Sequence, residues 1–138
     1  MTQRLCVRDL MTPGVYAVSV SDSLETIRAL MEERSIRHAP VVGEGGILIG
    51  LVTQRDVLRN SIKNQALPPS AMAAAMQMTT AGEIMTQDVV TAAPDQDIRD
   101  AARIMLAHKY GCLPVVEDAR LVGIVTESDF VRLLASGD

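Results

Sequence analysis

Aromatic residues are almost missing from this chain of 138 residues, which has two tyrosines, one phenylalanine and no tryptophan. A hydrophobic core must therefore be built from aliphatic side chains and from methionine, which occurs eight times. Single-stranded nucleic acids are bound largely by stacking their bases on exposed aromatic rings. This chain has almost no aromatic residues that could form such a stacking surface.

A surplus of positive charge is also lacking. Thirteen Lys and Arg residues stand against 17 Asp and Glu residues, and the net charge is −4. Proteins that bind DNA or RNA non-specifically neutralise phosphates with clustered cations, so nucleic acid is excluded as a partner. Hydrophobic residues make up 48% of the chain, which is typical of a folded globular protein and excludes disorder.

Cysteines and long apolar runs are scarce as well. Cys6 and Cys112 show neither metal-ligand nor disulfide spacing, which is typical of a reducing compartment. No stretch approaches the roughly 18 apolar residues of a membrane-spanning helix, and the first ten residues contain no apolar signal region. We therefore expect a soluble, cytoplasmic protein without a membrane partner. HExxH, GxSxG and GxxxxGK[ST] motifs are missing too, so we expect neither catalysis nor a metal.

The strongest positive signal is an internal repeat, which decides the fold before any single element does. Met11-Thr12 returns as Met85-Thr86, and eleven identities stay in register with one residue lost in the turn at 43–46. The identical pairs are Met11/Met85, Thr12/Thr86, Val15/Val89, Met31/Met105, Pro40/Pro114, Val41/Val115, Val42/Val116, Gly50/Gly123, Val52/Val125, Thr53/Thr126 and Asp56/Asp129. We call residues 7–62 copy one and residues 81–138 copy two, joined by a partly helical linker over 63–80.

Both copies predict the order strand, helix, strand, strand, helix, because β-branched runs alternate with helical spacing of apolar residues. The expected strands are 15–18, 39–42 and 47–53 in copy one, and 89–92, 113–116 and 120–126 in copy two. A copy of about 50 residues is marginal by itself. We therefore expect the two copies to pack together as one domain with a pseudo-twofold axis.

Polar residues predict where the helices begin. Asp22 and Glu25 form the pattern of a capping box, and Pro94 with Asp95 marks the equivalent position in copy two. In the linker, Ser70 is expected to cap a helix rich in Ala and Met. That helix is interpreted as a packed connector, since Ala and Met are strong helix formers.

The ordered recurrence of M-T-x-x-V, a helix, P-V-V, a hairpin and G-[LI]-V-T-x-x-D resembles a tandem pair of CBS domains, also called a Bateman module. The resemblance covers roughly residues 7–62 and 81–138. It implies an α+β fold in which two βαββα repeats pack sheet to sheet with pseudo-twofold symmetry and leave two clefts. It also implies a stand-alone regulatory module that binds AMP, ADP or ATP, with NAD(H) or S-adenosylmethionine as further options. The nucleotide would be a regulatory ligand and no cofactor is required; the module would signal to an effector protein in trans and form a homodimer.

The segments Thr53-Gln54-Arg55-Asp56 and Thr126-Glu127-Ser128-Asp129 allow two interpretations. Each can be a helix N-cap with its capping box. Each can also bind a ligand: the carboxylate accepts hydrogen bonds from two vicinal ribose hydroxyls, while the Thr hydroxyl and the first helix amides face a phosphate. The resemblance assigns those roles, and both interpretations can hold at once. A guanidinium at Arg55 where copy two has Ser128 predicts that the two clefts differ in phosphate preference.

The resemblance places the base beside the start of the second strand and the end of the first strand of each copy. Arg37 and His38 are candidates for a phosphate contact, with an ordinary surface histidine as the alternative for His38. Ala17 stands where many family members have Thr, so one hydroxyl is missing from that cleft, and aliphatic side chains must sandwich the base. The expected ligand contacts are Tyr16, Ala17, Ile36, Arg37, His38, Pro40, Thr53, Arg55 and Asp56 in copy one, and Val90, Thr91, Gly111, Cys112, Leu113, Pro114, Thr126, Ser128 and Asp129 in copy two.

Two other functions stay open at this point. One is a purely structural or oligomerisation module with no small-molecule ligand. The other is a nucleotide-hydrolysing enzyme, although the spacing of the cysteines and histidines supports no nucleophile and base pair. A mean hydropathy of +0.18 in so small a chain favours an apolar interface, and therefore the homodimer.

Overall fold

The computed structural model describes residues 4–63 and 66–136 and confirms a mixed fold of helices and small antiparallel sheets. Strands β1 and β2 form one hairpin and strands β3 and β4 form another. The elements are α1 (Val7–Leu10), α2 (Leu24–Arg34), β1 (His38–Val42), the 3₁₀ helix η1 (Glu44–Gly46), β2 (Leu48–Thr53), α3 (Gln54–Lys63), α4 (Pro69–Met78), α5 (Ala81–Ile84), α6 (Ile98–His108), β3 (Cys112–Glu117), β4 (Arg120–Thr126) and α7 (Glu127–Ser136).

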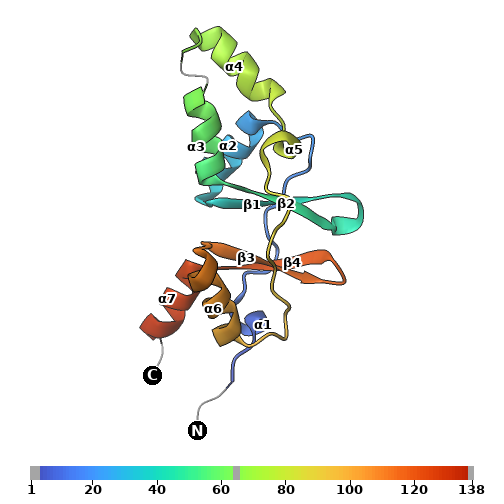
Figure 1. The fold of residues 1–138 in the computed structure, drawn as a ribbon, viewed down its shortest axis with the longest axis vertical. Helices are drawn as coiled ribbons and strands as arrows, with labels where there is room; N and C mark the ends of the chain where they lie inside the picture. The colour runs from blue at the N-terminus through green and yellow to red at the C-terminus, as the bar shows by residue number, and fades with distance from the viewer. Residues whose placement is uncertain (1–3, 64–65, 137–138) are drawn as a thin grey trace. The chain divides into compact units, whose positions relative to one another are not determined.

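The chain divides into two compact units that do not coincide with the two copies. The central unit is the continuous segment Tyr16–Val89, and the terminal unit joins the segment before Tyr16 to the segment from Val90 onward. In Figure 1 helices α2, α3 and α5 lie on one face of the β1–β2 hairpin, and helices α1, α6 and α7 lie on one face of the β3–β4 hairpin. Each unit therefore contains residues of both copies.

The Met-Thr motif that opens each copy pairs with the hairpin of the other copy. Thr12 forms an antiparallel bridge with Ile124, with N–H···O distances of 2.9 and 3.0 Å in the two directions. Thr86 forms the same bridge with Leu51, at 2.9 and 3.0 Å. We call these two segments the exchanged arms, since each one adds a third segment to a two-stranded hairpin.

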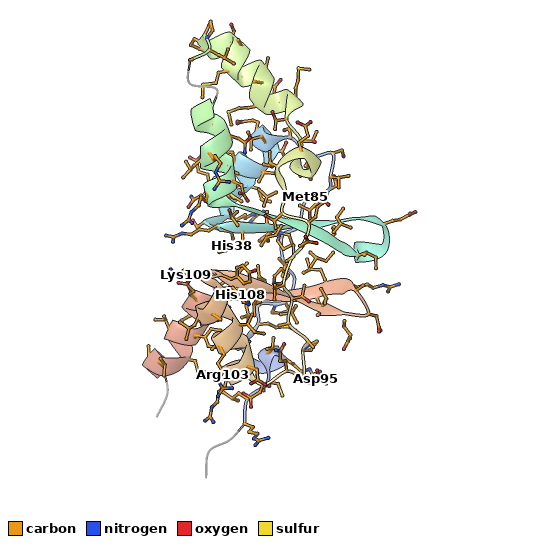
Figure 2. All side chains as sticks on the ribbon, viewed as in Figure 1. His38, Met85, Asp95, Arg103, His108 and Lys109 are labelled. Carbon is orange, nitrogen blue, oxygen red and sulfur yellow. The ribbon has the colours of Figure 1, made fainter. Side chains whose placement is uncertain are left out.

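A glycine in the hairpin makes room for each arm. A Cβ on Gly50 would overlap the sulfur of Met85 and lie 3.1 Å from the backbone carbonyl oxygen of Thr86. Figure 2 shows Met85 beside the β1–β2 hairpin. The contact recurs in the terminal unit, where a Cβ on Gly123 would lie 2.6 Å from the sulfur of Met11. Close approach of the arm therefore accounts for two of the repeated identities, Gly and Met.

The expected first strand of each copy is reduced to a single bridge residue. Val18 lies parallel to β1, donating its N–H to the Pro40 carbonyl at 2.9 Å and accepting the Val42 N–H at 2.9 Å. The next rung of such a ladder would run from the amide of residue 40 to the carbonyl of Tyr16, and proline has no N–H. Ala92 is placed identically beside Pro114. The repeated proline therefore ends the ladder after one residue.

Three helix starts differ from their predictions. The cap of α2 is Ser23, whose hydroxyl oxygen accepts the Thr26 N–H at 3.1 Å, whereas the Asp22 carboxylate accepts the Ser19 N–H. The cap of α6 is Asp97 rather than the predicted Pro94-Asp95 pair. Helix α4 begins at Pro69, so Ser70 lies inside its first turn. At α2 and α6 several capping residues stand close together, and the one used depends on where packing fixes the first turn, whereas α4 begins at a proline without any side-chain cap.

Each unit has its own core, and both cores are aliphatic with methionine, as the composition predicts. The central core is built from Val18, Leu24, Ile27, Met31, Ala39, Val41, Val52, Val57, Met76 and Ala81. The terminal core is built from Val7, Ala92, Ala101, Met105, Leu113, Val115 and Val125. Met76 belongs to α4, so the linker helix is a packed connector, as expected. Val7 belongs to α1, so the segment before Tyr16 contributes to the core of the terminal unit.

We predict that Gly50→Ala lowers the free energy of unfolding by about 1–3 kcal/mol, because the added methyl group overpacks the contact with Met85. Adding Met85→Ala should recover part of that loss, whereas adding Met11→Ala should recover none. Urea denaturation of the single and double variants gives the two coupling energies. Relief of Gly50→Ala by Met11→Ala would contradict the exchange of arms.

Candidate functional site

The Thr–Asp segment of copy one forms a complete capping box at the start of α3. The Asp56 Oδ2 accepts the Thr53 backbone N–H at 2.9 Å and the Thr53 hydroxyl at 3.0 Å. The Asp56 N–H in turn donates to the Thr53 hydroxyl oxygen at 3.2 Å. The hairpin thus ends at Thr53 and the helix begins at the next residue. The structural interpretation of this motif is correct, and it fixes the position of the carboxylate.

Copy two repeats the two hydrogen bonds to the carboxylate at the start of α7. The Asp129 Oδ2 accepts the Thr126 N–H at 2.8 Å and the Thr126 hydroxyl at 3.3 Å. Among the residues that the structure describes, Asp129 is the one charged residue that is buried. Burying a carboxylate without hydrogen-bond partners is costly, and the capping box supplies two of them.

Each carboxylate also faces an arginine one helical turn later, and sequence reasoning missed both arginines. Arg132 Nη2 lies 2.7 Å from the Asp129 Oδ1. Arg59 Nη1 lies 3.6 Å from the Asp56 Oδ1. Arg59 and Arg132 occupy equivalent positions in the register that pairs Asp56 with Asp129. Extending the repeat three residues further along the chain would have found them.

The start of the second strand of each copy lies directly beside the capping box. The Arg37 carbonyl accepts the Gln54 N–H at 2.8 Å, and His38 pairs with Thr53 across the hairpin. Ile36 immediately precedes this segment and is half-buried against the central core. We call the capping box with residues 36–38 the central site, where Figure 2 shows His38 at the beginning of β1.

The terminal site has the same backbone arrangement. The Gly111 carbonyl accepts the Glu127 N–H at 3.2 Å, and Cys112 pairs with Thr126. We use the name terminal site for the capping box of α7 with residues 110–112. The main-chain geometry at Arg37 and His38 is thus the same as that at Gly111 and Cys112, although the residue types differ.

The end of each expected first strand pairs with the strand that begins at the site, β1 in the central unit and β3 in the terminal unit. Tyr16 and Ala17 precede Val18, which is bonded to Pro40. The Arg34 guanidinium lies 4.8 Å above the Tyr16 ring, a cation–π contact that the sequence analysis did not anticipate. In the terminal unit Val90 and Thr91 precede Ala92, which is bonded to Pro114 by the same pair of hydrogen bonds.

Exposure separates side chains that can reach a ligand from those that cannot. Arg37, Arg55 and Ser128 are exposed at their sites. Pro40, Leu113 and Pro114 are fully buried, and Leu113 belongs to the terminal core. A fully buried side chain offers no contact surface, so these three positions offer a ligand their backbone at most.

Cys112 is a packed thiol rather than a reactive one. It is buried, and desolvation raises the pKa of its thiol to about 12. The thiolate is the nucleophilic form of cysteine, so a thiol that stays protonated at neutral pH is a poor nucleophile. The interpretation of Cys112 as a small apolar residue accounts for its place in β3.

A groove of about 290 Å³ lies between α2 and α3 of the central unit. It is lined by Arg28, Met31, Glu32, Gln54, Val57 and Leu58. None of these belongs to the expected ligand contacts. Across residues 4–63 and 66–136, no three His, Cys, Asp or Glu side chains lie where they could hold a metal ion, and no helix there is long and apolar enough to cross a membrane.

Solved structures similar to this chain include ligand-bound proteins. A protein from Vibrio cholerae described as an acetoin utilization protein (AcuB) superposes with a TM-score of 0.82 and 34% identity, covering 99% of each chain. CBSX2 in complex with AMP has a TM-score of 0.80 and 28% identity, covering 94% of this chain and 96% of that one. The CBS domain pair of MJ0100, in complex with 5′-methylthioadenosine and S-adenosyl-L-methionine, has a TM-score of 0.80 and 29% identity, covering 96% and 98%.

Sequence relatives and the family model agree with these structures. A homoserine O-acetyltransferase from Methanococcoides burtonii is 36% identical over 129 residues, 93% of this chain and 24% of that protein. The chain spans less than half the length of the first curated relatives that it matches. The sequence model of the CBS domain matches residues 7–63 and 81–136. The chain therefore belongs to the CBS domain family and carries two CBS domains in tandem.

Proposed function

We propose that the chain is a regulatory module that binds an adenosine-containing ligand at the central site and at the terminal site. The observation that supports this most is the repeated main-chain geometry: a capping-box carboxylate beside a strand start, twice in one chain. Similar CBS pairs have been solved with AMP and with S-adenosylmethionine. The candidate ligands are accordingly AMP, ADP, ATP, NAD(H) and S-adenosylmethionine.

Each part of such a ligand has a suitable group at the site. The carboxylates of Asp56 and Asp129 are acceptors for ribose hydroxyls, because an ionised carboxylate only accepts hydrogen bonds. The N-terminal ends of α3 and α7 favour a phosphate through the partial positive charge of the helix, while the first amide of each helix already donates to the Arg37 or Gly111 carbonyl. The Arg37 and Gly111 carbonyls each accept one hydrogen bond from a helix amide, which leaves the second lone pair of each oxygen for a donor on the edge of an adenine.

The output that we propose is control of a partner protein in trans rather than catalysis. The relatives named homoserine O-acetyltransferase contain a stretch similar to this chain in only about a quarter of their length. Their acetyltransferase activity is therefore not transferred to this chain. A cytoplasmic location is part of the proposal, and the two unpaired cysteines support it.

Removing one carboxylate should abolish one site. Asp56→Ala and Asp129→Ala should each weaken binding at their own site roughly ten- to hundredfold, because charge-assisted hydrogen bonding of a carboxylate to ribose contributes about 1.5–3 kcal/mol. Isothermal titration calorimetry with AMP measures both sites. Asp9→Ala is the matched control, since Asp9 accepts the Cys6 N–H at 2.8 Å in the capping box of α1 and belongs to neither site.

Two results would contradict this function. Unchanged AMP affinity in the Asp56→Ala/Asp129→Ala double variant would reduce both carboxylates to caps. No rise in melting temperature with any candidate ligand would favour the alternative, a structural or oligomerisation module without a small-molecule ligand, because a ligand that binds the native state stabilises it by mass action.

The central site should prefer the more highly charged ligand. Arg55 is exposed at the start of α3, where the terminal site has Ser128, and an arginine contact to phosphate is charge-assisted. In an Asp129→Ala background, Arg55→Ser should lower ATP affinity and leave adenosine affinity nearly unchanged, with an ATP effect that shrinks as salt is raised. The reciprocal control is Ser128→Arg in an Asp56→Ala background, which should raise ATP affinity. Equal losses for ATP and adenosine would show that Arg55 shapes the site instead.

A second copy of the chain is the proposed structural partner. Helices from both copies expose large apolar side chains: Leu58 is 56% exposed, Leu106 80%, Val131 64% and Leu134 82%. Exposed apolar surface of this kind is typical of an interface. Light scattering at micromolar concentration should give a dimer, and Leu106→Glu with Leu134→Glu should convert it to the monomer. Met78→Glu, on the exposed face of the linker helix, is the control that should stay dimeric, and a 14.9 kDa wild-type particle would refute the dimer.

A further inference from the structure

The two copies hold equivalent carboxylates with different numbers of partners. The Asp129 Oδ1 is paired with Arg132 at 2.7 Å, within hydrogen-bond distance. The Asp56 Oδ1 lies 3.6 Å from Arg59, which is beyond the length of a hydrogen bond. The side chain of Asp129 is 5% exposed and that of Asp56 is 16% exposed. The carboxylate of Asp56 in the central site is therefore more accessible than that of Asp129 in the terminal site.

Counting acceptor positions gives this difference a chemical meaning. A carboxylate has about four lone-pair positions, two on each oxygen. In both sites Oδ2 already accepts two hydrogen bonds, from the backbone N–H and the hydroxyl of Thr53 or Thr126. Oδ1 of Asp56 keeps two positions, enough for both hydroxyls of a ribose. Oδ1 of Asp129 keeps one, because Arg132 occupies the other.

A neutral hydroxyl is a weak competitor for the position that Arg132 holds. Both bonds are charge-assisted, because the acceptor is a carboxylate in each case, but only the guanidinium adds the attraction of a full opposite charge. The carboxylate is also buried, although Arg132 itself is 71% exposed, and a buried acceptor that loses a hydrogen-bond partner lowers stability. A ribose at Asp129 therefore adds one hydrogen bond beside the ion pair instead of replacing it.

We infer that Arg132 is a specificity-determining residue. Because of it, the affinity of the terminal site changes little when the ligand loses one ribose hydroxyl, whereas the central site distinguishes ribose from 2′-deoxyribose. This rests on the proposed function and adds a difference in sugar recognition between the two sites. The central site would then prefer ribonucleotides to 2′-deoxyribonucleotides, whereas the terminal site would bind both about equally.

The test compares AMP with 2′-deoxy-AMP by isothermal titration calorimetry. In the wild-type protein, replacing AMP by 2′-deoxy-AMP should weaken binding at one site about tenfold or more, the effect of one lost hydrogen bond to a charged group, and leave binding at the other site nearly unchanged. Asp129→Ala, which keeps the central site, should retain that discrimination. Asp56→Ala, which keeps the terminal site, should bind the two nucleotides within about threefold.

Replacing the arginine should transfer the discrimination. Arg132→Met keeps an unbranched side chain of similar length but removes the donor, so in the Asp56→Ala background it should raise the preference for AMP to about tenfold. Arg59→Met in the Asp129→Ala background is the matched control and should change the preference little. Since the wild-type titration needs no variant, a variant that fails to fold does not remove the test.

The possible failures are distinguishable. Binding of AMP with equal discrimination at both wild-type sites, or an Arg132→Met variant that still ignores the missing hydroxyl, would overturn the role of Arg132 and leave the proposed function intact. Wild-type protein that binds neither nucleotide in calorimetry or thermal shift would overturn both.

Discussion

A hairpin of two strands is marginal in water, because too few of its backbone groups and side chains are covered. Both hairpins of this chain gain a third segment at the outer edge of β2 or β4, and that segment comes from the other copy of the repeat. The bridge is short, yet it brings Met85 against Gly50 and Met11 against Gly123. The helices of each unit pack on a hairpin that is completed in this way. The hydrophobic core and the capping box of the unit include residues of the same hairpin.

A proline is the third residue of the first strand in each hairpin, and it affects both the fold and the candidate site. Pro40 and Pro114 are buried, so their rings contribute to packing. Each also lacks the N–H that would continue the parallel ladder toward Tyr16 or Val90. That rung is left unmade beside the capping box, where the proposed ligand needs main-chain groups. One residue type thus limits a strand and leaves a polar edge at a candidate site.

The repeat register predicted most of the fold and part of the site. The hairpins, the Thr–Asp caps and the aliphatic cores follow from patterns that each copy contains in full. The exchange of arms could not be predicted, because Met11 and Met85 are identical, as are Gly50 and Gly123, and identical residues do not specify which pairs form. The short distance from Arg132 to Asp129 could not be predicted either. Arg59 also follows its aspartate by three residues, yet its guanidinium lies farther from the carboxylate. Such differences arise from side-chain placement that sequence identity does not determine.

The exchanged arms also set an order for assembly during synthesis. The chain leaves the ribosome from its N-terminus, so Thr12 is available long before Ile124, its partner in the terminal unit. Contacts between residues so distant in sequence form slowly, because a long loop must close first. Meanwhile the completed β1–β2 hairpin meets the Met-Thr motif of residues 11–12 before residues 85–86 exist. The nascent chain therefore has an identical competitor for the edge of β2, and the native pairing is decided only when copy two supplies both the correct arm and the second hairpin.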